Sequence, residues 1–197
     1  MSFDAEYFER FYERRGTRVY DAEQVANLAR GVTGMIRWLG GELRNVLDVG
    51  AGAGFWRQYL RTHEPRVQYA SIDASPYACE RYGHEHRDIA RWCGDVRHDL
   101  VVCQGVLPYL NDVDAVAAID NMAAMCRGFL YLEAITQRDV RDVCDLDKTD
   151  VAVHLRPGAF YTAALARHFT RVGCGLYYVK SGRLAFYELE AHVAERT

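Results

Sequence analysis

One short stretch, residues 45–56, constrains the fold more than any other part of the chain. Its apolar residues lead into Asp48, and glycine then takes every second position from Gly50 to Gly54. An apolar run of this length is typical of a strand that is covered on both faces of a parallel sheet. The glycines allow a sharp turn into a helix and let a ligand approach the backbone closely. The stretch therefore predicts a nucleotide-type pocket at the end of a buried strand.

Size and composition indicate one soluble globular domain. The chain has 197 residues, of which 50% are hydrophobic and 26% charged, and its formal net charge is -3. Basic residues do not form a run, which argues against a nucleic-acid partner or an anionic membrane surface. No apolar segment reaches the roughly 18 residues that a membrane span needs, and no signal-peptide core is present. We expect a cytoplasmic monomer or homodimer with no membrane and no nucleic-acid partner.

The cysteines and histidines do not form a metal-binding pattern. Six cysteines occur without a Cys-x-x-Cys pair, so we expect reduced thiols packed as small apolar residues. His84-Glu85-His86 has no third ligand at a suitable spacing and is interpreted as a solvated strand. No metal is expected.

Strands and helices alternate through the middle of the chain. Apolar runs predict strands at 46–49, 67–72, 84–89, 99–103 and 129–134, with helices at 54–63, 75–82 and 112–125 between them. The helix at 112–125 is expected to be capped by Asp112. This alternation favours a parallel sheet with right-handed crossovers.

The two ends of the chain have different patterns. Residues 4–14 have helical spacing with an aromatic stripe, which predicts a packed helix or a lid over a ligand, and Asp21 caps a long helix that ends near residue 39. After a loop-rich connection at 136–156, a helix is expected at 157–168. Strands at 170–180 and 183–190 would then flank a Ser181-Gly182 turn. The expected single domain, 1–197, comprises a helical cap (1–41), a core (45–134), a connection with a helix (135–168) and a hairpin (169–190).

The glycine spacing does not favour a dinucleotide. A dinucleotide fingerprint requires a glycine at the sixth place counted from Gly50, where this chain has Phe55. The chain is also too short for a second nucleotide-binding half with a substrate domain. We therefore rank NAD binding low.

The series Asp48-x-Gly50-x-Gly52-x-Gly54, the acid Asp73 after the second strand and the terminal hairpin together resemble the class I S-adenosylmethionine-dependent methyltransferases. The resemblance covers residues 45–190. It implies an α/β Rossmann-like three-layer sandwich with a seven-stranded, mostly parallel sheet of order 3-2-1-4-5-7-6. It also implies S-adenosyl-L-methionine as cofactor and S-adenosyl-L-homocysteine as product.

The resemblance also implies which residues hold the cofactor. The loop residues Asp48, Gly50, Ala51 and Gly52 would pass under its methionine and ribose parts. Asp73, with Ala74, would accept hydrogen bonds from the ribose hydroxyls. Asp88 and Ile89 would contact the adenine. They are preferred to the alternative Asp95 because they leave more residues for the connection to the fourth strand. Gln104 and Gly105 would face the methyl group from the end of that strand.

The acceptor side is less well defined by the sequence. The Asn/Asp-Pro-Pro-aromatic signature of amide and base methyltransferases is absent, and Gln104 replaces the aspartate that begins a magnesium site in catechol-type enzymes. We expect methyl transfer to the oxygen or nitrogen of a small molecule. Tyr109 and His154 are the candidate catalytic residues, and Tyr7, Tyr12, Arg156 and Tyr161 are the candidate substrate-binding residues. A non-catalytic module that binds cofactor or protein stays open as the alternative, and a macromolecular acceptor ranks lower.

Overall fold

The sheet of the protein has the strand order that the family resemblance implies. The computed structural model describes residues 3–192, and its seven strands have the order β3-β2-β1-β4-β5-β7-β6. The strands are β1 (Asn45–Val49), β2 (Gln68–Asp73), β3 (Glu85–His86), β4 (His98–Gln104), β5 (Cys126–Glu133), β6 (Phe169–Gly173) and β7 (Leu176–Val179). Pairs among β1 to β5 are parallel, whereas β7 runs antiparallel to β5 and β6. The predicted fold class is thus confirmed.

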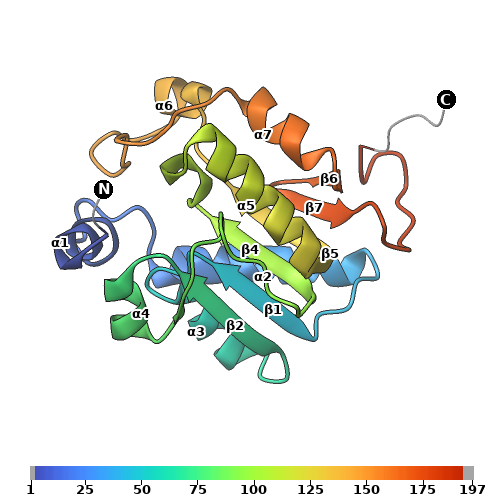
Figure 1. Ribbon diagram of the computed structural model, residues 1–197. Helices are drawn as coiled ribbons and strands as arrows, with labels where there is room; N and C mark the ends of the chain where they lie inside the picture. Colours follow the sequence, from blue (N-terminus) through green and yellow to red (C-terminus); the bar gives the residue numbers. More distant parts are fainter. Residues whose placement is uncertain (1–2, 193–197) are drawn as a thin grey trace.

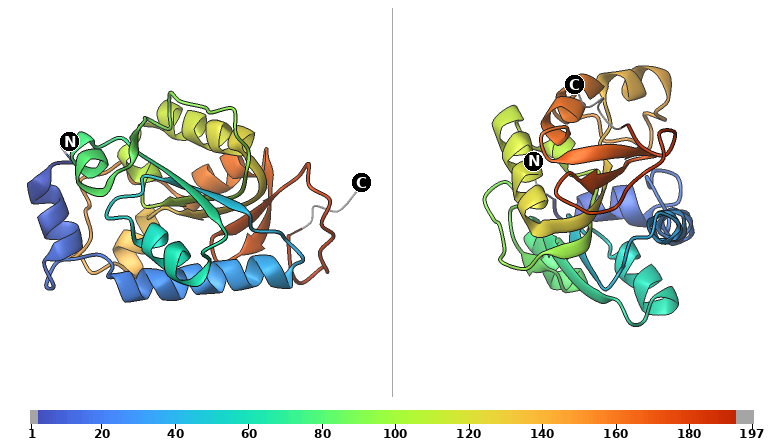
Figure 2. Two further views of the ribbon diagram at one scale, coloured as in Figure 1. Left: turned by 90° about the horizontal axis from the view of Figure 1, so that it is seen from below. Right: turned by 90° about the vertical axis from the view of Figure 1, so that its right-hand side faces the viewer.

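Helices cover both faces of this sheet. They are α1 (Ala5–Phe8), the π-helix η1 (Glu9–Glu13), α2 (Ala22–Trp38), α3 (Phe55–His63), α4 (Pro76–Tyr82), the short 3-10 helix η2 (Leu107–Tyr109), α5 (Asp112–Met125), α6 (Gln137–Asp142) and α7 (Gly158–Leu165). α2 packs beside α3 on one face, and α5 contacts α7 on the other (Figure 2). The result is a three-layer sandwich.

Local capping fixes where several helices begin. Asp21 accepts a hydrogen bond from the Gln24 amide, and the Gln24 side chain accepts one from the Asp21 amide, which completes a capping box. For α5 the capping residue is Asn111, one position before the expected Asp112. Its amide oxygen accepts the Asp114 N–H, and such an Asn satisfies the first-turn donors as well as an aspartate does.

The central strands form the core and bring their ends to one edge. All residues of β4 from His98 to Cys103 are buried, and Val46, Leu100 and Leu130 have no exposed surface. The carboxyl ends of β1, β2, β4 and β5 meet on the side where α1 and α6 lie (Figure 1). Ligands of open α/β sheets bind at this edge.

The C-terminal hairpin differs from the prediction. The turn lies at Cys174-Gly175, and both residues have positive φ, 47° and 77°, as a two-residue hairpin turn of the I′ type requires. Ser181-Gly182 therefore does not form the turn, and residues 183–190 form no strand. Gly182 instead allows close contact, because a Cβ there would collide with the Tyr178 ring.

Two further features complete the fold. The connection at 136–156, expected to be all loop, contains α6, which Thr136 caps with Asp139 in a second capping box. Within residues 3–192, no helix has the length and apolar character to cross a membrane.

Candidate functional site

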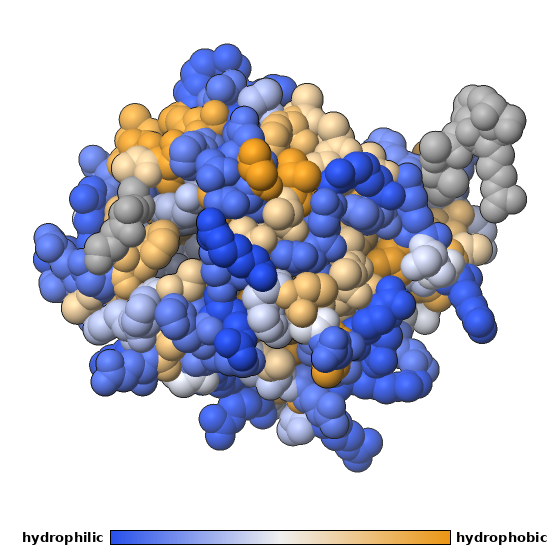
Figure 3. All heavy atoms as spheres, viewed as in Figure 1, coloured by the Kyte–Doolittle hydropathy of each residue, from blue (hydrophilic) through white to orange (hydrophobic). Residues whose placement is uncertain are grey.

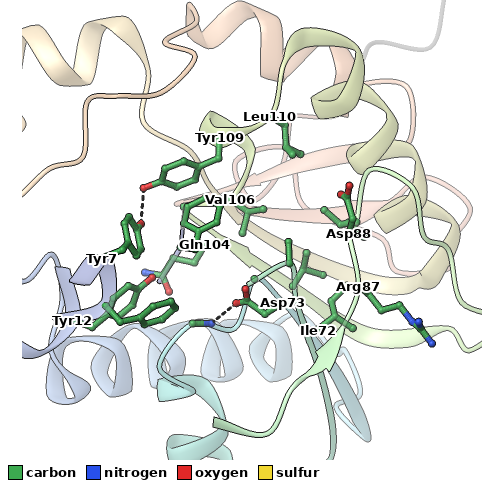
Figure 4. A pocket seen from close by; sticks show the side chains of 18 residues that line it. Tyr7, Tyr12, Ile72, Asp73, Arg87, Asp88, Gln104, Val106, Tyr109 and Leu110 are labelled. Atoms are coloured by element: carbon green, nitrogen blue, oxygen red, sulfur yellow. Dashed lines mark hydrogen bonds between the residues drawn. The ribbon is translucent and has the colours of Figure 1, made fainter. Parts of the chain in front are cut away.

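Two adjoining cavities open at the carboxyl ends of the parallel strands. The first, of about 100 Å³, lies between the ends of β2 and β4 and the N-terminal helix, and Figure 4 shows the side chains that line it. The second is larger, about 370 Å³, and extends towards β5 and the 143–153 segment. The lining residues that both cavities share are Tyr7, Tyr12, Gly50, Gln104, Gly105 and Tyr109. The two cavities are therefore neighbouring compartments of one site.

The glycine loop forms the floor between them. Gly50 and Gly52 have φ of +66° and +53°, and Gly54 at +73° is the N-cap of α3. A Cβ on Gly50 would collide with Val106, and one on Gly52 would lie 3.0 Å from the Tyr12 hydroxyl. Both the backbone conformation and the close approach therefore require glycine here.

Asp73 is held in a fixed orientation at the first cavity. One of its carboxylate oxygens accepts the Gly52 amide at 2.9 Å, and the other accepts the Ser75 amide at 2.8 Å. The residue is only 9% exposed. Each oxygen keeps a second lone pair, so the carboxylate can also accept a pair of hydroxyls. The structure thus brings the predicted acid and the predicted loop together.

Of the two acids proposed to contact the adenine, Asp88 and Asp95, only Asp88 lies at the cavity. Asp88 and Ile89 line the first cavity beside Ala74. The Asp88 carboxylate accepts the Ala90 amide at 2.9 Å and forms a 2.5 Å ion pair with Arg91. Asp95 is exposed and lines neither of the two cavities.

Tyrosines from the N-terminal helix close the site from above. The hydroxyls of Tyr7 and Tyr109 are 2.7 Å apart (Figure 4). Tyr109 also donates to Asp150 at 3.1 Å. Ser75 also donates to the Phe3 carbonyl at 2.6 Å. Burial raises the pKa of Tyr7, Tyr12 and Tyr109 above the ordinary tyrosine value. These hydroxyls are therefore neutral near pH 7, and Tyr109 is suited to contacting a ligand rather than to removing a proton.

A hydrogen-bonded chain ends at Glu133 in the second cavity. Trp56 Nε1 donates to Gln104 Oε1 at 3.2 Å, and Gln104 Nε2 donates to Glu133 Oε2 at 3.2 Å. Tyr20 donates to the other Glu133 oxygen at 2.9 Å. Burial raises the pKa of Glu133. This residue was not predicted from the sequence. It ends β5 in register with Gln104, and ligands of such sheets bind at the carboxyl ends of strands, so its position could have indicated it.

Asp48 lies beneath the loop in the same cavity. It is 3% exposed, and Tyr69 donates a 2.6 Å hydrogen bond to its carboxylate. Burial, partly offset by that hydrogen bond, raises the pKa of Asp48 to about 7. This acid is thus half protonated near neutrality.

The structure corrects the roles expected for Arg156 and Tyr161. Both are buried, at 4% exposure each, and neither lines the two cavities. The Arg156 guanidinium donates to the carbonyls of Leu107 and Leu110, to the Tyr161 hydroxyl and to the Asp112 carboxylate. Arg156 therefore fixes the η2 turn that carries Tyr109 and lies outside the lining of both cavities.

His154 is likewise displaced from the expected catalytic position. Its side chain is exposed, and the residue is absent from the lining of both cavities. Its backbone amide donates to the Pro108 carbonyl at 2.8 Å. That bond brings Val153, its neighbour, to the second cavity, while the imidazole itself points elsewhere.

His84 is a functional position that sequence reasoning misread as solvated. It is 8% exposed, and its Nε2 donates to the Gly52 carbonyl at 2.9 Å, while Nδ1 accepts from Arg57 at 3.0 Å. Burial lowers the pKa of His84, and the Arg57 guanidinium acts in the same direction. The neutral ring thus holds the glycine loop. Within residues 3–192, no group of three or more His, Cys, Asp or Glu side chains is arranged to hold a metal ion.

Comparison with known proteins gives the family. The methyltransferase domain family matches the sequence over residues 7–177. Because this match spans most of the chain, the protein belongs to the methyltransferase domain family. No curated protein matches the sequence.

Solved structures share the fold. The sugar N-methyltransferase KedS8 from Streptoalloteichus sp. is 21% identical, with a TM-score of 0.60 over 91% of this chain and 93% of that one. The N-methyltransferase NodS from Bradyrhizobium japonicum, in complex with S-adenosyl-L-homocysteine, is 20% identical, with a TM-score of 0.55 over 77% and 87%. Magnesium protoporphyrin IX methyltransferase from Synechocystis, with bound S-adenosylmethionine, is 17% identical, with a TM-score of 0.55 over 91% and 93%. At these identities the likeness establishes the fold.

Proposed function

We propose that the protein transfers the methyl group of S-adenosyl-L-methionine to a small-molecule acceptor. The observation that carries the proposal is the contact between the Gly52 amide and the Asp73 carboxylate at the first cavity. It places a glycine floor and a fixed acceptor of hydroxyl hydrogen bonds side by side, which is what a ribose with a vicinal diol requires. Structural neighbours solved with S-adenosylmethionine or S-adenosylhomocysteine support the same ligand.

The residues of the first cavity fit the adenosine part of this cofactor. Asp73 would accept the two ribose hydroxyls, with Ala74 beside it. Asp88 would accept the adenine amino group, while the apolar side chains of Ile72 and Ile89 would pack on the ring. A single acidic contact and apolar walls are the usual composition of a purine pocket.

The second cavity is then the place of transfer. Gln104 and Gly105 lie at the boundary of both cavities, where the cofactor supplies a methyl group already activated by its sulfonium. The chain's own contribution is alignment of the acceptor and exclusion of water by Tyr7, Tyr12 and Tyr109. The enclosed volume of about 370 Å³ suits a small acceptor rather than a macromolecule.

Titration calorimetry with S-adenosylhomocysteine, beside NAD, tests the cofactor. We expect S-adenosylhomocysteine to bind and NAD not to bind. Asp73→Asn keeps the shape of the side chain and should weaken binding at least about tenfold, because a hydrogen bond to a charged group contributes roughly 1.5–3 kcal/mol. Asp95→Asn, at an exposed position outside the cavities, is the matched control. Unchanged affinity in Asp73→Asn would refute the proposal.

Turnover separates an enzyme from a binding module. Methyl-labelled S-adenosylmethionine is incubated with a panel of small acceptors, and labelled products are identified by mass spectrometry. Incorporation into a small molecule supports the proposal. Binding of S-adenosylhomocysteine without any transfer, to small molecules or to added proteins, would assign the chain to non-catalytic modules of this fold.

A further inference from the structure

The second cavity is lined by more acidic than basic side chains. Its lining includes four carboxyl groups, those of Asp48, Glu133, Asp145 and Asp150, and one lysine, Lys148. Lys148 forms a 3.1 Å ion pair with Asp145. In the part of the chain that the structure describes, no salt bridge joins the other three carboxyls to a cationic side chain. Glu133 accepts hydrogen bonds from Tyr20 and Gln104, and Asp150 accepts one from Tyr109. None of these donors is charged, so a bound cation would still be favourable.

The cofactor alone does not balance this charge. S-adenosylmethionine carries a sulfonium, an ammonium and a carboxylate, so it brings one net positive charge. Asp48 lies in β1, the strand that leads into the glycine loop. Glu133, at the end of β5, and Asp150, in the 143–153 segment, line the same cavity from other elements. Two carboxyl groups are thus left for a second ligand.

Aromatic side chains in the same cavity favour the same kind of ligand. The aromatic residues that line it are Tyr7, Phe11, Tyr12, Tyr20, Phe55, Trp56 and Tyr109. The face of an aromatic ring attracts an ammonium group, and carboxylates and rings together are the usual means of recognising alkylated amines. These aromatic side chains are a second observation, separate from the carboxyl groups, and they also indicate a cationic ligand.

The mouth of the cavity is apolar. Val19 and Val143, which line it, are 39% and 79% exposed, and Leu146 and Val151 of the same segment are also exposed. Figure 3 shows hydrophobic side chains gathered around the region of α6 on this side of the molecule. An exposed apolar rim around a polar cavity marks a place where an apolar body binds.

We propose that the acceptor is an amine on an apolar body, with its protonated nitrogen bound between Glu133 and Asp150. The inference rests on the proposed function and specifies its substrate. The bound ammonium gives a proton to the Glu133 carboxylate, and the freed lone pair forms the nitrogen–carbon bond to the methyl group. The carbon–sulfur bond breaks as this happens, and its electron pair stays on sulfur. The methylated ammonium leaves, and Glu133 returns its proton to solvent.

The test is the binding of probe pairs, matched in shape but different in charge, to the full chain saturated with S-adenosylhomocysteine. The pairs are phenethylamine with phenethyl alcohol, cyclohexylamine with cyclohexanol, and hexylamine with hexanol. We expect the amines to bind at least about tenfold more tightly than the alcohols, as a charge-assisted contact of about 1.5–3 kcal/mol implies.

Two variants locate the interaction. Glu133→Gln should weaken amine binding about tenfold or more and leave alcohol binding and S-adenosylhomocysteine binding within about twofold. Asp150→Asn, which keeps an oxygen to accept the Tyr109 hydroxyl, should act in the same direction. Glu80→Gln, at an exposed position on α4, is the control and should change nothing.

The outcomes separate this inference from the proposed function. Equal binding of amines and alcohols, amine binding undiminished in both variants, or no amine binding to the S-adenosylhomocysteine complex would each overturn the inference while the cofactor assignment stands. Failure of S-adenosylhomocysteine to bind would overturn the proposed function. The probes are therefore also titrated into the free chain, where a preference for amines lost in Glu133→Gln would support the cationic site by itself.

Discussion

The hydroxyl of Tyr7 lies 2.7 Å from the hydroxyl of Tyr109, although 102 residues separate the two in sequence. Tyr7 belongs to α1, and Tyr109 ends the η2 turn after β4. The contact therefore joins the N-terminal helix to the part of the sheet edge where the two cavities meet. Because Tyr109 also donates to Asp150, the same hydroxyl ties a third segment to the site.

Removing this hydrogen bond should loosen the N-terminal helix. In Tyr7→Phe the ring packing remains and one part-buried hydrogen bond is lost, which costs about 1 kcal/mol. We expect the amides of residues 5–13 to exchange with deuterium about fivefold faster, with no change in the strands. Hydrogen exchange read by mass spectrometry measures this. Tyr187→Phe, at a position 81% exposed, is the control, and equal exchange in both variants would mean that the contact does not hold the helix.

Asp48 should make stability depend on pH. Its pKa of about 7 in the folded protein is higher than in an unfolded chain, where it is about 3.9. The folded state then favours the protonated acid, so its contribution to stability is present below the unfolded pKa and is lost as pH rises through about 7.

Asp48→Asn cannot titrate and keeps an oxygen for the Tyr69 hydroxyl. The free energy of unfolding of the variant, relative to that of the natural protein, should therefore increase as the pH rises from about 5 to about 8. The increase should reach up to a few kcal/mol, at about 1.4 kcal/mol per pKa unit. Urea unfolding at the two pH values measures the difference. Asp95→Asn should show no such trend, and a pH-independent difference for Asp48→Asn would show that the buried acid is not the titrating group.

Gly52 should not tolerate replacement in the loop that faces the first cavity. Its φ of +53° is unfavourable for other residues by about 1–2 kcal/mol, and a Cβ would lie 3.0 Å from the Tyr12 hydroxyl. Gly52→Ala should lower the free energy of unfolding by that amount and weaken S-adenosylhomocysteine binding more than about tenfold. Gly31→Ala, on the exposed side of α2 where a Cβ meets nothing within 4 Å, should instead stabilise by about 0.5–1 kcal/mol. Calorimetry of both variants makes the comparison.

The order of the elements was predictable because periodicity and capping are local. The alternation of buried strands and helices, and the Asp21 and Ser75 caps, are features that neighbouring residues determine. The hairpin turn was not predictable in the same way. Cys174 adopts a positive φ, which is rare for cysteine, because the pairing of β7 with β5 and β6 imposes it. Ser181-Gly182 has the sequence more typical of a hairpin turn, but no strand follows it to pair with β7.

The site was predictable where a residue ends a strand, as Asp73 and Gln104 do, or follows it directly, as Gly50 does. It was not predictable where a contact spans elements. Arg156 has a charge typical of a binding residue, yet it donates to four acceptors in or beside η2, at the start of α5 and on α7. Only the tertiary fold shows this. Glu133 could have been predicted from the sequence. Ligands of open α/β sheets bind at the carboxyl ends of the strands, and this applies to β5 as it does to β4.

His84 holds the glycine loop, so its loss should affect both folding and cofactor binding. In His84→Phe the Gly52 carbonyl loses its imidazole donor, which costs about 1–3 kcal/mol in a buried setting. Because burial lowers the folded-state pKa of His84, its contribution to stability is present above the unfolded pKa of about 6.5 and is lost as pH falls below it.

The natural protein should therefore lose more stability on acidification than His84→Phe does, and the gap between the two should narrow from about pH 7.5 to about pH 5. His63→Gln, at an exposed position on α3, should change neither the pH dependence nor S-adenosylhomocysteine affinity. Urea unfolding and calorimetry measure the two properties. A gap that stays constant with pH would mean that His84 is not the proton-sensitive support of the loop, because no other change distinguishes the variant.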